Sequence, residues 1–91
     1  MRKHRAIVLN EKDNVATMLS DVKRGDYVEV VFQGRSWTIK ALNDIPFGHK
    51  IALKEIHEGE HVIKYGEIVG VATKEIRKGE HVHVHNLRSA F

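Results

Sequence analysis

Apolar positions along this chain fall into short runs and alternations, separated by polar stretches that contain glycine. Residues 6–9 are apolar, residues 27–32 are rich in β-branched and aromatic side chains, and residues 36–42 alternate between apolar and polar. Runs of this length and period predict strands, and the turn residues at 33–35 join the last two strands into a hairpin. Further short strands are predicted over residues 51–53, 62–66, 68–72 and 82–87.

One segment has the helical period instead. Over residues 15–22 the apolar positions recur with a period near 3.6. Asp13 or Asn14 precedes this segment as an N-cap residue, and Gly25 follows it in a position that glycine favours after a helix. The pattern therefore predicts a mainly β fold with one short helix, arranged as a single domain over residues 1–91.

A phrase of the sequence is used more than once. Residues 54–62 (KEIHEGEHV) return as residues 74–82 (KEIRKGEHV), and a degenerate copy stands at 22–28 (VKRGDYV). Each copy has an apolar residue, two polar residues, glycine, an acid, any residue and valine. We expect the glycine to supply the positive φ of a tight turn, and the flanking apolar residues to anchor the turn in the core. The uneven spacing excludes a solenoid, and two similar hairpins arising by chance are the alternative.

Composition narrows the chemistry. The chain of 91 residues has no cysteine, which excludes disulfides, thiolate nucleophiles, iron–sulfur clusters and cysteine-type zinc sites. A metal would therefore need histidine or carboxylate ligands. Its formal charge of +3 is spread among alternating acids and bases, with one dense basic cluster at residues 2–5. Basic and aromatic residues are not interleaved, which argues against nucleic-acid binding. No apolar run reaches the roughly 20 residues of a membrane span and no signal peptide is visible, so we expect a cytoplasmic protein.

Three histidines alternate near the end of the chain. If residues 82–87 form a strand, His81, His83 and His85 share one face at spacings of roughly 7 Å, while Val82 and Val84 point to the core. Two of the imidazoles can then converge on one cation, since neutral imidazole is a common ligand of iron, zinc and manganese. A solvated polar strand face is the alternative.

Four further basic residues outside this strand are considered for functional roles. His49 lies in the irregular segment 43–50 and is a candidate metal ligand or general base, with a turn histidine bonded to backbone as the alternative. Lys50 beside it is a candidate for holding a substrate carboxylate, or else a solvated lysine. His57 is read as a surface residue. His61 occupies the position of His81 in the other long copy and is left open.

Four phrases, in order, resemble the altronate and galactarate dehydratase family. Residues 45–53 are similar to its signature IPxGHKIAL and residues 79–87 to GEHVHxHNL; residues 13–17 and 63–70 resemble its DNVA and IKYGxxIG phrases. One departure is that many members carry His-Pro where this chain has Asn10-Glu11. The resemblance implies the small N-terminal domain of those enzymes, an SAF domain with a β-clip fold.

In some members of that family this domain is a separate subunit beside a large one. The resemblance thus implies the small subunit of a sugar-acid dehydratase, which removes water from altronate or galactarate to give a 2-keto-3-deoxy acid. It assigns His49 and Lys50 to catalysis and His81, His83 and His85 to a divalent metal, Fe²⁺ or Mn²⁺, with Zn²⁺ a further candidate for the isolated chain. The expected partners are the large subunit and the sugar acid.

Two rival functions stay open on the sequence alone. One is the small subunit of a sulfolactate sulfo-lyase, which resembles the same family and eliminates sulfite. The other is a non-catalytic SAF binding module, which would have no need of aligned imidazoles. Whichever holds, short strand edges on a small β domain favour self-association, and the lack of an enclosing pocket predicts that the chain alone is inactive.

Overall fold

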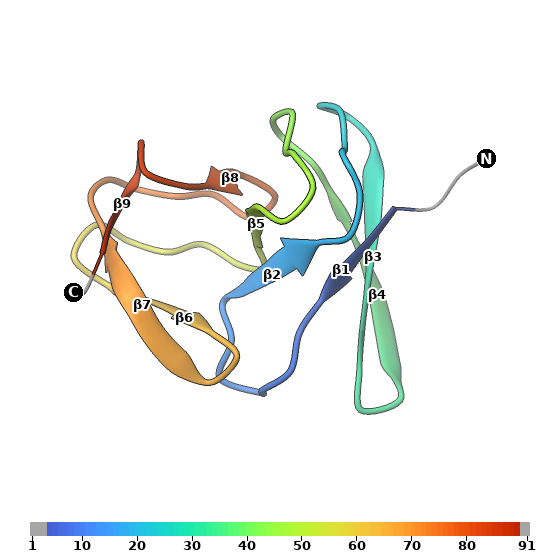
Figure 1. Cartoon of the computed structure of the whole chain (residues 1–91), viewed down its shortest axis with the longest axis horizontal. Helices are drawn as coiled ribbons and strands as arrows, with labels where there is room; N and C mark the ends of the chain where they lie inside the picture. Colours follow the sequence, from blue (N-terminus) through green and yellow to red (C-terminus); the bar gives the residue numbers. More distant parts are fainter. Residues whose placement is uncertain (1–3, 90–91) are drawn as a thin grey trace.

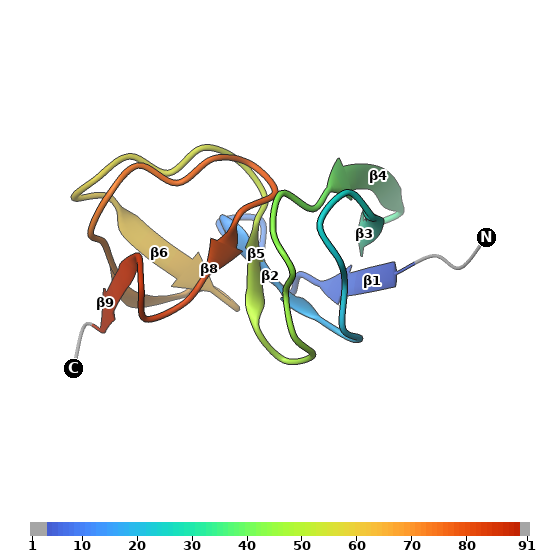
Figure 2. The same cartoon turned by 90° about the horizontal axis from the view of Figure 1, so that it is seen from above.

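The computed structural model describes residues 4–89 and contains nine strands in that range. A six-stranded sheet has the order β4-β3-β1-β2-β5-β8, and a three-stranded sheet has the order β6-β7-β9. The two sheets lie side by side along the long axis of the molecule (Figures 1 and 2). The predicted mainly β class is confirmed. The strands are β1 (His4–Ile7), β2 (Val15–Met18), β3 (Tyr27–Phe32), β4 (Arg35–Lys40), β5 (Lys50–Ala52), β6 (His61–Lys64), β7 (Glu67–Ala72), β8 (His81–Val82) and β9 (Leu87–Ser89).

The predicted helix over residues 15–22 is wrong, and residues 4–89 contain no helix. This segment begins with β2, which pairs antiparallel with β1 on one side and with β5 on the other. Val15, Ala16 and Met18 are all buried, so β2 has apolar residues on both faces. A strand buried on both faces loses its polar–apolar alternation, and a short apolar run then reads equally well as a helix stripe.

Both hairpins close through two-residue turns in which each residue has a positive φ. Gln33 and Gly34 have φ values of 50° and 75° between β3 and β4, and Tyr65 and Gly66 have values of 55° and 80° between β6 and β7. Turns of this kind match the right-handed twist of the strands that they join. The hairpin predicted around residues 33–35 is therefore confirmed.

The repeated phrase forms the same glycine turn in every copy, and the structure adds a copy that sequence comparison missed, at residues 45–51. The copies associate in pairs. Val22 and Ile45 exchange two backbone hydrogen bonds of 2.9 and 2.8 Å, and Ile56 and Ile76 do the same at 2.9 and 2.8 Å. The four turn glycines have φ values of 93° (Gly25), 83° (Gly48), 89° (Gly59) and 90° (Gly79).

Each pair of turns contributes to its own hydrophobic cluster. Val22 and Ile45 pack in a cluster with strands of the six-stranded sheet, whereas Ile56 and Ile76 pack in a second cluster with residues of β6 and β7. The valines that end the three recognised copies are fully buried, as predicted from the phrase: they are Val28, Val62 and Val82, each 0% exposed.

The buried side chain of Asn14 joins the two sheets. Its Nδ2 group donates to the carbonyl of His61 at 2.9 Å, and its Oδ1 atom accepts from the N–H of Ile63 at 2.7 Å. Both partners belong to β6, whereas Asn14 directly precedes β2. A buried amide with both ends satisfied fixes one orientation between the sheets, because any other leaves polar groups unpaired.

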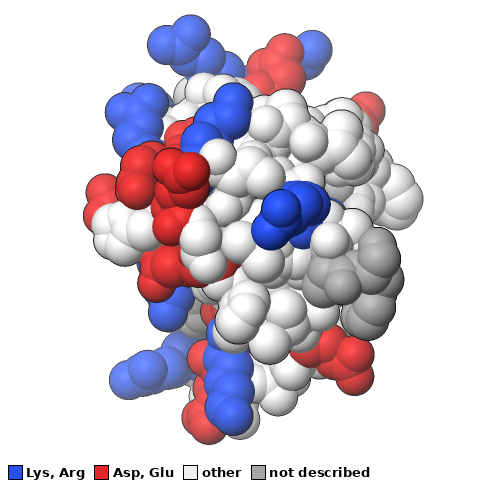
Figure 3. Space-filling model, turned by 90° about the vertical axis from the view of Figure 1, so that its left-hand side faces the viewer, with Lys and Arg blue, Asp and Glu red and all other residues white. Residues whose placement is uncertain are grey.

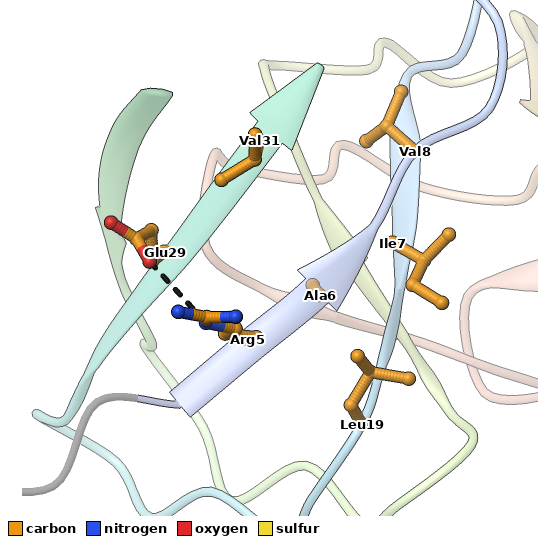
Figure 4. Close-up of a pocket in the computed structure, with 7 residues that line it drawn as sticks. All are labelled: Arg5, Ala6, Ile7, Val8, Leu19, Glu29 and Val31. Carbon is orange, nitrogen blue, oxygen red and sulfur yellow. Dashed lines mark ion pairs between the residues drawn. The ribbon is translucent and has the colours of Figure 1, made fainter. Parts of the chain in front are cut away.

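The outer face of the six-stranded sheet has a shallow hollow over β1 and β3 (Figure 4). Arg5 and Glu29 form an ion pair of 3.4 Å across it, beside the apolar side chains of Ile7, Leu19 and Val31. The rest of the basic cluster at residues 2–5 includes Arg2 and Lys3, which lie outside the described residues. Over residues 4–89, the structure has no helix long and apolar enough to traverse a lipid bilayer.

Candidate metal centre

Three histidines from two separate parts of the chain converge beside β5 and β8. His49 directly precedes β5, His81 begins β8 and His83 follows it. β5 and β8 are antiparallel neighbours, with Ile51 opposite His81, so the start of β5 and the end of β8 lie together. One ring nitrogen from each histidine can be chosen such that all three lie within 4.8 Å of one another.

The contacts within this histidine cluster are close. The Nδ1 atom of His49 lies 2.9 Å from the Nε2 atom of His81. The His49 and His83 rings stack with centroids 4.1 Å apart and planes 17° apart, and the His81 and His83 rings stack at 5.5 Å and 12°. The His49 and His81 rings also stack, at 5.1 Å and 28°, so each of the three rings contacts the other two.

The turn that carries His49 differs from the other three copies in one useful way. In the other copies the acid after glycine closes the turn by accepting the N–H three residues earlier: Lys23 to Asp26 at 3.0 Å, His57 to Glu60 at 2.6 Å and Arg77 to Glu80 at 3.0 Å. In this copy the earlier residue is Pro46, which has no N–H to satisfy. An acid is therefore not needed at this position to accept a hydrogen bond, and His49 occupies it.

The predicted strand over residues 82–87 is wrong, because the chain turns at residues 83–86 between β8 and β9. The cause is Asn86, which is 0% exposed. Its Oδ1 atom accepts the N–H of His83 at 2.9 Å, and its Nδ2 group donates to the carbonyl of His81 at 2.9 Å. These bonds replace strand pairing, so His83 folds over His49, and Val84 is 82% exposed rather than in the core.

The common face predicted for the three alternating histidines therefore holds for only part of the set. The His85 ring lies 5.1 Å from that of His81 at an interplanar angle of 47°, outside the three-residue group. His57 is a surface residue, as predicted, and pairs with Glu75 at 2.7 Å. His61 is exposed on β6.

Burial and neighbouring charges favour the uncharged forms of His81 and His83. Desolvation by burial, followed by repulsion from the other histidines, lowers the pKa of His81 to about 4. Burial also lowers the pKa of His83, and His49 and Lys50 add to this effect. A neutral imidazole has a free lone pair on one ring nitrogen, which is the form that binds a metal. The donor set fits a divalent cation.

Lys50 lies close enough to the cluster to affect it electrostatically. Its charge contributes to the lowered pKa values of His81 and His83. Burial, and then repulsion by Lys64, lowers the pKa of Lys50 itself. The half-buried ammonium group is a suitable partner for an anion bound next to the histidines.

Two asparagines and a proline position the histidines, and sequence reasoning assigned none of them a role. Asn86 holds the turn after β8, and Asn43 accepts the N–H of His81 at 2.9 Å. Pro46 has no N–H, so a histidine can replace the acid at position 49. A signal was present for two of them, because Pro46 and Asn86 stand within the phrases that contain the histidines.

A groove of about 370 Å³ runs from the histidine cluster between two of the glycine turns, with His81 among its lining residues. Asp21 and Asp44 line its sides. Each caps the opposite turn: Asp21 accepts the N–H of Phe47 at 2.8 Å and Asp44 accepts the N–H of Arg24 at 2.8 Å. Each carboxylate has a second oxygen that can accept a hydrogen bond from a bound molecule.

The fold and the site define a small β domain that presents histidines where two loops meet a short strand. Residues 4–90 match the family model of the altronate/galactarate dehydratase SAF domain. The chain therefore belongs to the SAF domain family of altronate and galactarate dehydratases, as its sequence phrases predicted.

Individual relatives show how much of an enzyme this chain represents. It is 42% identical over 83 residues to altronate dehydratase of Escherichia coli (strain K12) and 37% identical over 83 residues to that of Bacillus subtilis (strain 168). Each match covers 91% of this chain but 16% of the relative. The chain is also 40% identical over 60 residues to (2R)-sulfolactate sulfo-lyase subunit alpha of Paracoccus pantotrophus, covering 66% of this chain and 90% of that protein.

Proposed function

We propose that this chain is the small subunit of a metal-dependent sugar-acid dehydratase and acts together with a large subunit. The reaction is the elimination of water from an altronate- or galactarate-type acid to give a 2-keto-3-deoxy acid. The observation that carries the proposal is the convergence of His49, His81 and His83 in a chain that belongs to this SAF domain family.

His49, His81 and His83 would hold the divalent cation, Fe²⁺ or Mn²⁺ in the assembled enzyme and Zn²⁺ as a further candidate in the isolated chain. Such a cation stabilises the negative charge that develops when the C–H bond beside a carboxylate loses its proton. His85 is outside the three-residue group and is the weakest of the predicted ligands. His49 was also a candidate general base, but its contacts with both other histidines favour the role of ligand.

Lys50 would hold the substrate carboxylate, since its ammonium group is half-buried beside the cluster. The groove that runs from His81 then gives the hydroxylated chain of the substrate a place to lie. Asp21 and Asp44 line it with carboxylate oxygens, which accept hydrogen bonds from hydroxyl groups.

The large subunit is needed because this chain provides only part of an enclosing site. The relatives named altronate dehydratase are much longer, and the chain matches 16% of their length. We therefore propose that the remaining walls, and a base for the C–H proton, come from the large subunit.

The small subunit of a sulfolactate sulfo-lyase is the second candidate. It is favoured by one observation: the match to subunit alpha of that enzyme covers 90% of the relative, so the two chains are of comparable extent. The carboxylates of Asp21 and Asp44 would repel a sulfonate placed in the groove. They would equally repel the second carboxylate of galactarate, so they favour an acid whose far end carries hydroxyl groups, such as altronate.

An assay of the chain with its large subunit separates these candidates. The complex is incubated with Fe²⁺ or Mn²⁺ and with altronate, galactarate or (2R)-sulfolactate. Formation of a 2-keto-3-deoxy acid supports the dehydratase, whereas release of sulfite supports the second candidate. The chain without the large subunit is the control. Sustained turnover by the chain alone would contradict the proposal that the large subunit is required. A complex inactive on all three acids would leave the non-catalytic binding module.

A further inference from the structure

We infer that Phe47 and Val84 form a docking surface for the large subunit, so that the histidine cluster lies at the interface between the two chains. The identity of the partner rests on the proposed function. Phe47 is 65% exposed and Val84 is 82% exposed, the highest values among the large apolar side chains in the part of the chain that the structure describes. Exposed apolar side chains that gather in one patch mark an interaction surface, whereas single ones need no explanation.

The two residues belong to the two segments that carry the stacked pair of histidines. Phe47 stands two residues before His49, and Val84 directly follows His83, whose ring stacks on His49 at 4.1 Å. The loop that precedes β5 and the turn between β8 and β9 project to the same side of the molecule, at the top of Figure 1 and at the bottom of Figure 2. A partner seated on both would cover the histidines between them.

Comparison of the four glycine turns shows that the fold does not require Phe47. The residue before glycine is Arg24, Glu58 or Lys78 in the other copies, and each of those turns has the same positive φ at its glycine. A charged side chain is therefore compatible with this backbone, and it is the usual choice at an exposed turn. The aromatic residue stands only in the copy that carries His49.

Val84 is likewise dispensable for its turn. Residues 83–86 are held by the buried side chain of Asn86 and by the bond from the N–H of Asn86 to the carbonyl of His83 at 3.0 Å. Val84 makes no contribution to either hydrophobic cluster. An apolar side chain that the fold does not use, placed between two histidines, is best explained by a partner that covers it.

Protein interfaces combine apolar and charged areas, and both are present at one end of the molecule. Figure 3 shows the end that carries β6, β7 and β9, where acidic side chains gather along one side and a mostly uncharged area with a few basic side chains lies next to them. An interface of standard size covers about 800 Å² per partner and has an apolar, often aromatic, centre with a polar rim. Phe47 and Val84 would supply the apolar centre of such an interface.

The test measures binding of this chain to the large dehydratase chain of the same organism, using isothermal titration calorimetry. The wild type is compared with the double variant Phe47→Ser/Val84→Ser and with a control, Leu9→Ser/Val31→Ser. Leu9 and Val31 are 63% and 51% exposed, and Val31 lies on the outer face of the six-stranded sheet (Figure 4). The Phe47/Val84 variant is expected to bind at least about tenfold more weakly, since loss of a buried aromatic anchor often exceeds that effect. The control is expected to bind like the wild type.

Two further measurements make each outcome decisive. Circular dichroism and Zn²⁺ binding must match the wild type in both variants, which shows that the fold and the histidines are intact. If the wild type binds and the Phe47/Val84 variant binds equally well, the docking surface is wrong and the proposed function stands. If the wild type does not bind the large chain, the proposed function fails and the inference with it. If sedimentation instead shows a wild-type dimer that the variant abolishes, with binding to the large chain unchanged, the occupant is a second copy and the inference is overturned.

Discussion

The Nδ1 atom of His49 lies 2.9 Å from the Nε2 atom of His81, although 32 residues separate them in the chain. The antiparallel pairing of β5 with β8 creates this proximity. His49 stands where the other turns have an acid, next to the start of β5. A hydrogen bond between two ring nitrogens requires one to donate and the other to accept, so at least one ring must be neutral. Metal binding requires more, because every imidazole that coordinates the cation must be neutral.

Metal binding is expected to depend strongly on His83. Replacing His83 by alanine removes one of three converging imidazoles, so affinity should fall at least about tenfold, as ligand-shell changes commonly do. The fold should be nearly unchanged, because His83 is half-buried and outside both hydrophobic clusters. Fe²⁺, Mn²⁺ and Zn²⁺ are titrated at a pH above about 7.

The matched control for this titration is His57→Ala. His57 is an exposed histidine that pairs with Glu75 and has no contact with the cluster. Its removal should leave metal binding unchanged. Equal affinities of the wild type, His83→Ala and His57→Ala would show that the histidines are a solvated surface.

Asn86 is expected to stabilise both the turn and the cluster. Asn86→Ala removes two side-chain hydrogen bonds from a site with 0% exposure and leaves the partner groups of His81 and His83 unpaired. Unfolding free energy should fall by about 2–4 kcal/mol, the cost of two such groups, and metal affinity should fall with it. Urea denaturation measures the first quantity. Asn43→Ala loses one exposed hydrogen bond to the N–H of His81 and should cost less than about 1 kcal/mol; a larger loss there than at Asn86 would contradict the assignment.

The pKa values of two histidines should be shifted in opposite directions. The pKa of His81 is lowered to about 4 from the usual 6.5, so between these values the unfolded chain binds more protons than the folded one. Stability should therefore fall as the pH is lowered from about 6.5 to about 4, and the fall should be smaller in His81→Gln. NMR titration of the metal-free chain should give the low pKa directly. A measured value near 6.5 would mean that His81 is not shielded from water.

His57 provides the opposite case. Its hydrogen bond and charge interaction with Glu75 raise its pKa, and those with His57 lower the pKa of Glu75. The pair thus stabilises the folded chain above the usual glutamate pKa of 4.5 and loses this contribution as the pH rises through the raised pKa of His57. Glu75→Gln should return the His57 pKa towards 6.5 in the same NMR experiment. The effect on stability is small, because both groups are exposed to solvent.

Sequence reasoning found the strands that alternate or are rich in β-branched residues, such as β3 and β4, because one exposed face leaves a legible pattern. It failed at β2, which is buried on both faces, and at the turn before β9, where the Asn86 side chain competes with strand pairing. Of the site, His81 and His83 followed from their spacing. His49 was also named as a candidate ligand, but its place beside His81 and His83 depends on pairing between β5 and β8, a long-range contact that no local period reports.

Two turn glycines with the same backbone conformation should differ in their tolerance of alanine. Gly59 and Gly79 have φ values of +89° and +90°, so alanine at either position pays the cost of the left-handed region, about 1–2 kcal/mol. A Cβ at Gly59 would meet nothing within 4 Å, whereas a Cβ at Gly79 would collide with the carbonyl oxygen of Lys40 and lie 3.3 Å from Leu42. Overpacking of this kind costs a further 1–3 kcal/mol or so.

Gly79→Ala should therefore destabilise the chain by about 2–5 kcal/mol and Gly59→Ala by about 1–2 kcal/mol, measured by urea denaturation. The two variants should also differ in metal binding. Gly79 accepts the N–H of Leu42 at 2.9 Å and stands two residues before His81, so a shift that relieves the collision also moves His81 away from His49. Gly59 is in the turn before β6 and has no such connection to the cluster. Zn²⁺ affinity should fall in Gly79→Ala and stay at the wild-type level in Gly59→Ala, and equal behaviour of the two variants in both measurements would show that the close approach of Lys40 does not position the site.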